Sequence, residues 1–546
     1  MNTAGAGYIQ PSLEDIQNFK GKYPKQLWGL FFSEMWERFC FYGMRGVLTY
    51  FMVTHLILNT GGHMDAVQAN LQYGATQAFV YAFTFIGGLF ADKILGFRKS
   101  LFWGGILMII GSAILAFDPF PENNFFLGIS FTVIGTGFFK PNISTMVGSL
   151  YKRDDSRRDA GFSLFYSGIN IGALLGGYAC IAIGKGQLFT SFIPAEYTWN
   201  VAFGLAGIVM TISLVTFLFT QRNLGPIGLS PFRSQDDQLR TVKHVEGDKV
   251  APEDVAPVTV QVKSGKGWYE YAVYALTLAL IPVIMTMVAK TEYTDYFMYI
   301  IGPATLVYLI YEMTKHTWAE SKKLIAALVF ILFSIIFWAF FEQSGGSLSI
   351  FAAQNLDNVV AGTFTLDPNG VNNAANSVFV IIFAPIVGLV WVAMAKKKIE
   401  PNTVIKFGLG FLFLAGGFYV LYITRFFEVV AGSGIASLDV FVLAYFVITF
   451  GELCLSPIGL SIMTKLSPQK LQGVMMGMWF LASAYGQYVA GILGAGLSEG
   501  GENDSLPQKL ATFTDGYYQL AIYALIAGIV LIAISPLVRK LMQEVK

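Results

Sequence analysis

Long apolar segments recur along the whole chain and alternate with short polar stretches. A run of about 18 or more mostly apolar residues is long enough to cross a bilayer as a helix. Only a helix can do so alone, because it satisfies its own backbone groups in lipid. The fourteen predicted spans are 27–57, 70–94, 99–118, 124–147, 160–184, 198–220, 268–290, 294–314, 322–350, 373–395, 403–424, 438–464, 471–497 and 515–538. The pattern predicts an all-α polytopic membrane protein.

Lysine and arginine alternate between the connections. One set of connections holds nearly all of them, such as the run Lys396–Lys398. The other set holds only Lys185, Lys290, Arg425 and Lys509. Because cytoplasmic loops carry the excess of these residues, both termini are predicted to be cytoplasmic, in a multi-pass protein of the cell (inner) membrane.

Six polar or aromatic residues form a stripe along the first span. They are Glu34, Glu37, Arg38, Phe41, Tyr42 and Arg45. Steps of three and four residues place them on one face of a helix. One charge at the bilayer centre costs about 2.5–3.5 kcal/mol, so four would cost on the order of 10 kcal/mol in lipid. The stripe therefore predicts a water-filled path through a helical bundle.

A second polar site lies deep in the span 124–147, where Lys140 is followed by Pro141 and Asn142. Proline removes a backbone donor and is predicted to kink the helix, opening polar backbone to a cavity. An intramembrane lysine in this setting is typical of a substrate or ion pathway. The alternative is a structural ion pair with another helix.

Two more carboxylates lie within spans, Glu342 in 322–350 and Glu452 in 438–464. The buried acids then nearly balance the buried bases, which predicts pairing between helices and one carboxylate that takes a proton. No histidine is central in a span, so a proton carrier is expected to be a glutamate.

Composition and motifs narrow the function. The chain has 546 residues, 54% hydrophobic and 13% charged, with net charge +1; the absence of a basic face disfavours nucleic acid. Its three cysteines lack metal-ligand spacing, so neither a metal nor a cofactor is expected. No Ser-His-Asp set or nucleotide loop is placed plausibly, which indicates that the protein is not an enzyme. The first 26 residues lack the apolar core of a signal peptide.

The spans and connections divide the chain into six parts. They are a cytoplasmic tail (1–26), an N-terminal six-helix bundle (27–220), a cytoplasmic loop (221–267), an inserted helix pair (268–314), a C-terminal six-helix bundle (315–538) and a second cytoplasmic tail (539–546). The loop is rich in Pro, Gly, Ser and mixed charge. Loops of this length are usually functional or disordered, so it is either a linker or a gating element.

These motifs resemble the proton-dependent oligopeptide transporter family, also called the peptide transporter (PTR) family, of the major facilitator superfamily. The strongest match is the Glu-x-x-Glu-Arg signature at Glu34–Arg38. The segment Phe165–Gly172 is similar to the family's Phe-Tyr-x-x-Ile-Asn-x-Gly signature. Further matches are the Gly-x-Gly-x-x-Lys-Pro-Asn segment at 135–142, the Phe-Glu-Gln segment at 341–343, the segment 451–461 and the Met-Gly-Met-Trp-Phe-Leu segment at 476–481. The helix pair 268–314 matches that of bacterial members.

The resemblance implies a major facilitator fold, two six-helix bundles plus two extra helices, acting by alternating access as a proton-coupled importer of di- and tripeptides. The implied carboxylate ligands are Arg38 and Lys140, and the implied amino-terminus ligands are Asn170, Glu342 and Asn376. The implied side-chain pockets are lined by Tyr42, Tyr81, Trp338 and Trp479. Proton coupling would involve Glu34, Glu37, Arg38 and Glu342, and the implied gate pairs are Arg45 with Glu342 and Lys140 with Glu452. A monomer in the lipid bilayer is expected.

The chain departs from the family pattern in three ways. The loop 221–267 is longer than is common in the family, which leaves its role open. Phe41 replaces a tyrosine, so one hydroxyl contact is absent. Ser377 follows Asn376 where a proline is usual, and Asn373 replaces a glutamine, so that helix is expected to bend less. The alternatives are the same fold carrying nitrate, an amino acid or a peptide-like drug, a non-transporting receptor, or a channel.

Overall fold

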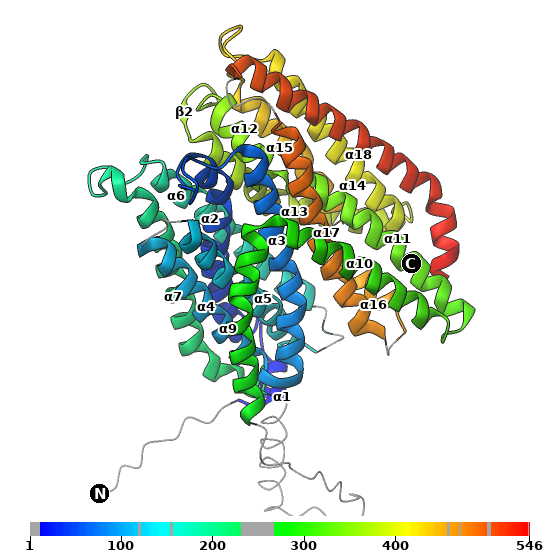
Figure 1. Cartoon of the computed structure of the whole chain (residues 1–546). Coiled ribbons are helices and arrows are strands. Elements are labelled where there is room, and N and C mark those ends of the chain that lie inside the picture. Colours follow the sequence, from blue (N-terminus) through cyan, green and yellow to red (C-terminus); the bar gives the residue numbers. More distant parts are fainter. Residues whose placement is uncertain are drawn as a thin grey trace, which may run out of the picture.

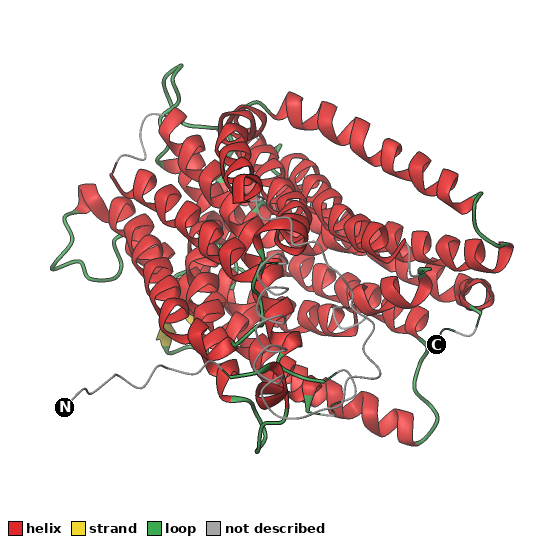
Figure 2. Ribbon diagram, turned by 90° about the horizontal axis from the view of Figure 1, so that it is seen from below, coloured by secondary structure: helices red, strands yellow, loops and turns green. Residues whose placement is uncertain are grey.

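The computed structural model describes residues 11–117, 122–152, 155, 157–230, 267–455, 459–468, 471–499, 504–543 and 545. Residues 1–10 of the predicted tail and 231–266 of the predicted long loop lie outside the described residues. Helices make up nearly all of the described chain (Figure 2). The short hairpin of β1 (Val359–Val360) and β2 (Phe364–Thr365) holds the only paired strands of this part.

The first group of helices comes from the N-terminal part of the chain. It comprises α1 (Leu13–Gln17), α2 (Lys25–Thr54), α3 (Ala66–Phe90), α4 (Phe97–Phe117), α5 (Glu122–Ser149), α6 (Arg158–Gly184) and α7 (Thr198–Thr220). A π-helical turn, Ala91–Leu95, extends α3, and a 3-10 turn, Gln221–Leu224, extends α7. Helices α2–α7 pack on one another and are called the N-terminal half below.

The second group follows the residues that are not described. It comprises α9 (Gly267–Ala289), α10 (Thr291–Met313), α11 (Trp318–Phe341), α12 (Ser347–Asn355), α13 (Pro368–Lys396), α14 (Thr403–Ile423), α15 (Leu438–Leu455), α16 (Gly459–Leu466), α17 (Gln472–Leu497) and α18 (Leu506–Met542). Helices α11–α18 form the C-terminal half. The two halves lie side by side and meet mainly through α3 against α17 and α6 against α13 (Figure 1).

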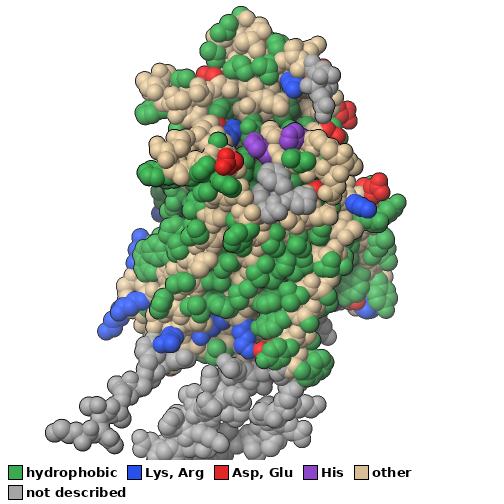
Figure 3. Space-filling view, turned by 60° about the vertical axis from the view of Figure 1, so that its left-hand side comes forward, with side chains coloured by type: hydrophobic (Ala, Val, Ile, Leu, Met, Phe, Trp, Pro, Cys, Tyr) green, Lys and Arg blue, Asp and Glu red, His purple; other side chains and the backbone are tan. Residues whose placement is uncertain are grey.

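Twelve helical stretches of the described chain are long and apolar enough to cross a membrane. They correspond to every predicted span except 27–57 and 124–147. These two are the helices α2 and α5, which carry the charged stripe and Lys140. They lie at the two remaining predicted spans, and the helices together confirm the all-α polytopic fold. Hydrophobic side chains form a broad band across the molecule, and Lys and Arg gather at one edge of it (Figure 3).

One predicted span is interrupted. The sequence predicts a single helix over 322–350, but α11 ends at Phe341 and the 3-10 turn Glu342–Gly345 precedes α12. Two consecutive glycines, Gly345 and Gly346, follow Glu342 and disfavour a continuous helix at this point. The break places Glu342 at a helix end, where backbone groups are available to other helices.

Each half has its own hydrophobic core. One cluster of buried side chains extends from Ile16 to Val288, and a second extends from Leu309 to Met542. Helix α9 belongs to the first cluster, and the end of α10 belongs to the second. The helix pair α9–α10 therefore bridges the two halves, because α10 also contacts α3 and α17.

Candidate functional site

A cluster of three buried charges forms on α2. Arg38 Nε lies 3.2 Å from Glu34 Oε1 and donates a hydrogen bond to Glu37. The three side chains are at most 2% exposed. Glu34 lies one helical turn before Arg38, and Glu37 is adjacent to it in sequence, so all three groups come from one element. The cluster is therefore a property of this helix alone.

The same three residues retain polar atoms without a protein partner. Glu34 Oε2, Glu37 Oε1 and Arg38 Nη2 are buried and accept or donate no hydrogen bond to the described residues. Buried polar atoms in native proteins almost always have a partner. The two carboxylate oxygens are therefore suited to accept a proton or a hydrogen bond, and Arg38 Nη2 is suited to donate one to water or a polar ligand.

Glycines bring α6 against this cluster. A Cβ at Gly172 would lie 2.1 Å from the carbonyl oxygen of Met35, and one at Gly176 would lie equally close to that of Phe39. Any side chain there would separate the helices. The close approach holds α6 beside α2, and buried Asn170 lies two residues before Gly172 on α6, where its amide donates to the Tyr166 carbonyl at 2.9 Å.

Lys140 faces an aromatic ring. Its Nζ lies 4.3 Å from the centroid of the Tyr81 ring, a cation–π distance. No carboxylate of the described residues lies within 4.0 Å of Lys140. Helix α5 continues through Pro141 to Ser149.

Asn142 connects two helices, since its side-chain amide donates a hydrogen bond to Ser100 Oγ at 3.0 Å and so joins α5 to α4.

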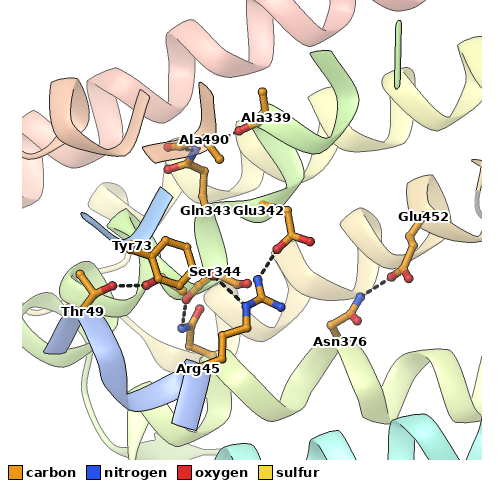
Figure 4. A network of polar contacts seen from close by, with 12 residues as sticks. Arg45, Thr49, Tyr73, Ala339, Glu342, Gln343, Ser344, Asn376, Glu452 and Ala490 are labelled. Carbon is orange, nitrogen blue, oxygen red and sulfur yellow. Dashed lines mark hydrogen bonds and ion pairs between the residues drawn. The ribbon is translucent and has the colours of Figure 1, made fainter. Parts of the chain in front are cut away.

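Arg45 and Glu342 form an ion pair between the halves (Figure 4). Arg45 Nε also donates to the Tyr73 hydroxyl at 2.7 Å. One turn further along α2, Thr49 donates to the Gly345 carbonyl. The 3-10 turn that interrupts the predicted span thus supplies both a carboxylate and a carbonyl to α2. Tyr73 and Thr49 were not identified from the sequence.

A second link between the halves lies near the end of α6. Lys185 Nζ is 2.8 Å from Asp367 Oδ2, which also accepts a hydrogen bond from Gln187 at 2.9 Å. Asp367 caps the start of α13 through the Gly370 amide. This buried pair was not identified either, because both residues lie in connections between spans.

Four asparagines follow one face of α13. They are Asn369, Asn372, Asn373 and Asn376. Asn372 donates to the Ser344 carbonyl at 2.7 Å and accepts from the Tyr445 hydroxyl at 2.6 Å. The face thereby connects the turn that carries Glu342 with α15. The spacing of three and four residues is a signal that could have identified this network in the sequence.

Glu452 has polar partners on both sides. It accepts a hydrogen bond from Asn376 at 2.9 Å (Figure 4) and one from the Tyr166 hydroxyl at 3.3 Å. Asn376 also donates to Thr449 Oγ at 3.2 Å. The pair of Glu452 with Lys140, which the resemblance implies, is not formed among the described residues. The N-terminal half contacts Glu452 through the Tyr166 hydroxyl instead.

The predicted aromatic residues divide between the halves. The Arg45 guanidinium lies 5.6 Å from the centroid of Tyr42, and the Arg38 guanidinium lies 5.2 Å from that of Phe41. Trp338 packs edge-on against Phe341. Trp479 is buried, 7% exposed, and lies where a side chain at Gly459 would be. Tyr42 therefore lies with the charged stripe, and the tryptophans lie in the C-terminal half.

The described residues contain no cluster of three His, Cys, Asp or Glu suited to a metal. Cys40, Cys180 and Cys454 are buried free thiols. The described site offers charge and hydrogen bonding from Arg38 with its two carboxylates, from Lys140, and from Glu342 and Glu452.

Comparisons with known proteins agree on one family. A model of the POT family matches residues 98–505. The chain is 33% identical to peptide transporter YePEPT of Yersinia enterocolitica subsp. palearctica, over 96% of each chain. It is 30% identical to a di-/tripeptide transporter of Lactococcus lactis subsp. cremoris, over 96% of this chain and 97% of that one. A crystal structure of a mutant peptide transporter POT in complex with alafosfalin superposes with a TM-score of 0.74 at 30% identity, over 98% of this chain and 100% of that one.

Proposed function

The chain belongs to the POT family, a family of transporters and not of enzymes, and from this premise we propose that it imports di- and tripeptides together with protons. The observation that carries the proposal is the buried cluster of Arg38, Glu34 and Glu37, whose unpartnered atoms lie in a membrane-spanning helix. Buried charge at this depth is retained where it binds a substrate or an ion.

A peptide with free termini carries one charge at each end. In our proposal Arg38 and Lys140 hold its carboxylate by charge-assisted hydrogen bonds. Asn170, Glu342 and Asn376 bind its amino group, while Tyr42, Tyr81, Trp338 and Trp479 line the side-chain pockets. Lys140, which has no carboxylate partner among the described residues, and the unpartnered Arg38 Nη2 support this assignment, since each leaves hydrogen-bond donors for a carboxylate. Fixed charges with apolar surroundings recognise a backbone and tolerate many side chains.

Proton coupling follows from the carboxylates. We propose that Glu34, Glu37 and Glu342 take up or release protons as the peptide binds, and that this changes which bridges form between the halves. A switch of this kind works only through differential stabilisation of two states. One charge moving down about 100 mV releases about 2.3 kcal/mol, enough for roughly fifty-fold accumulation of a neutral substrate.

Alternating access would use the gate pairs Arg45–Glu342 and Lys140–Glu452 in turn. The Arg45–Glu342 and Lys185–Asp367 pairs are formed, while Lys140 and Glu452 are not paired. By the predicted orientation, the formed pairs lie toward the outside. We therefore propose that this structure is the state closed to the outside, with a multi-pass placement in the cell membrane and both termini cytoplasmic.

The test is uptake by the purified full chain in sealed liposomes. Labelled dialanine should accumulate under an imposed inward proton gradient, and a protonophore should abolish the accumulation. Equal accumulation of dialanine with and without the proton gradient would contradict proton coupling. Absence of peptide uptake, with uptake of nitrate or an amino acid instead, would favour the other cargo that the fold can carry.

A further inference from the structure

A cavity of about 710 Å³ lies where the start of α14 meets the end of α18, far in sequence from the charged stripe. We propose that it binds the phosphodiester headgroup of an anionic phospholipid. Its lining includes Glu400, Asn402, Lys406, Arg539, Lys540 and Gln543. Its volume falls in the range of about 300–1,000 Å³ that small-molecule sites occupy.

The charges of the lining select the ligand. Lys406, Arg539 and Lys540 face one acid, Glu400, which forms an ion pair with Lys406. Among the described residues no carboxylate lies within 4.0 Å of Arg539 or Lys540. Within the described part of the chain, Arg539 and Lys540 thus offer two cations to an anion, and an arginine can bind two phosphate oxygens at once. A ligand with a phosphate group fits this lining better than a cation or a neutral solute does.

The surroundings of the cavity indicate a lipid source. The Lys406 ammonium lies 4.6 Å from the centroid of the Trp391 ring, and tryptophan is enriched at the level of lipid headgroups. Leu537, two residues before Arg539 on α18, is 60% exposed. Apolar surface for acyl chains thus adjoins a basic pocket. Basic pockets between helices at the cytoplasmic side are suited to anionic headgroups.

Two hydrogen bonds within the C-terminal half lie beside the cavity. Gln543 donates to the Ala319 carbonyl at the start of α11, at 3.1 Å. Ser535 donates to Asn402 Oδ1 at 3.3 Å. These contacts hold the end of α18 against α11 and α14, and a bound headgroup would join α14 to α18.

The experiment is native mass spectrometry of the full chain in neutral detergent, titrated separately with phosphatidylglycerol, phosphatidylcholine and glycerol 1-phosphate. We expect phosphatidylglycerol to bind most tightly. The combined substitution Lys406→Gln, Arg539→Gln and Lys540→Gln should weaken it by about tenfold or more. Glu400→Gln should strengthen binding, because it releases Lys406 from its ion pair.

A matched control removes three cations elsewhere, by Lys93→Gln, Lys152→Gln and Arg222→Gln. If both triple variants bind phosphatidylglycerol equally well, or if phosphatidylcholine binds as tightly, the cavity is not an anionic headgroup site. If glycerol 1-phosphate occupies the wild-type site as tightly as the lipid does, the ligand is a soluble phosphate and the lipid proposal is wrong. Should the triple variant fail to fold, Glu400→Gln still decides the question, because unchanged binding there contradicts the proposal.

Discussion

Arg38 and Arg45 lie two helical turns apart on one face of α2, yet they are neutralised in different ways. Arg38 pairs with Glu34 and Glu37 of its own helix. Arg45 pairs with Glu342 of the C-terminal half, 297 residues away in sequence. The first cluster keeps its partners wherever the halves move. The second exists only when α2 and the turn Glu342–Gly345 are in contact.

This difference separates two roles that one stripe of charges can have. A cluster internal to a helix can bind a ligand or proton in every conformation. A pair that spans two halves can report or stabilise one conformation, because its two partners move apart when the halves separate. In our proposal the Arg38 cluster is the binding and coupling site, and the Arg45–Glu342 pair is a gate.

Removing Arg38 should have the largest effect. Arg38→Ala leaves Glu34 and Glu37 buried without their cation, which should destabilise the fold by about 3–5 kcal/mol and abolish peptide uptake. Thermal unfolding in detergent and liposome uptake measure the two effects. Arg38→Lys keeps the charge without the planar guanidinium and should restore much of the stability. A stable Arg38→Ala protein with normal uptake would show that the cluster has no such role.

Glu37→Gln should strongly reduce proton-driven accumulation of peptide without abolishing peptide exchange. The amide keeps an acceptor for Arg38 but cannot release a proton, so accumulation driven by a proton gradient should fall by at least about tenfold while exchange of peptide continues. Both rates come from the same liposomes, loaded with or without unlabelled dialanine. If the variant accumulates peptide as the wild type does, Glu37 is not the coupling residue.

A double-mutant cycle on Arg45 and Glu342 tests the link between the halves. Arg45→Ala and Glu342→Ala should each destabilise the protein, and the double variant should be little less stable than either single variant. The unfolding midpoints should then give an interaction energy between the two residues of about 0.5–3 kcal/mol. The exposed neighbours Asp92 and Lys93, 3.0 Å apart, are the control and should show a coupling of no more than about 1 kcal/mol. Equal couplings in the two cycles would argue against a special role for the buried pair.

Tyr445→Phe removes only the hydroxyl that donates to Asn372. One hydrogen bond contributes about 1 kcal/mol, and the loss leaves a buried acceptor on α13. A lower unfolding midpoint and a lower maximal rate of uptake are expected, with little change in the peptide concentration for half-maximal rate. Phe441→Leu, on the same helix, is a packing control that should change stability without this kinetic pattern.

The smallest expected change in stability is that of the ion pair between Arg157 and Asp155, outside the membrane. Arg157 donates to both carboxylate oxygens of Asp155, at 3.0 and 2.8 Å, and these bonds lower the pKa of Asp155 from 3.8 to about 2. Because the folded-state pKa is depressed, the stabilisation is fully present above about pH 4 and is lost as the pH falls through about 2. The unfolding midpoints of wild type and Asp155→Asn should therefore differ at neutral pH and converge toward pH 2. A difference that persists at pH 2 would have another cause.

The sequence determined the membrane-spanning helices, because apolar length is local information. It also determined the Arg38 cluster, since Glu34 and Glu37 lie within one turn of Arg38 on the same helix. The break after Phe341 was missed. Hydropathy does not register a turn whose polar backbone is satisfied by another helix.

Only the tertiary structure decided which charges meet between the halves. Sequence and resemblance treat Arg45–Glu342 and Lys140–Glu452 alike, but the first pair is formed and Glu452 is bound by Asn376 and Tyr166 instead. The partners in each case belong to helices far apart in the chain. Their distance depends on how two separately packed cores are positioned against each other, and no local pattern of residues contains that information.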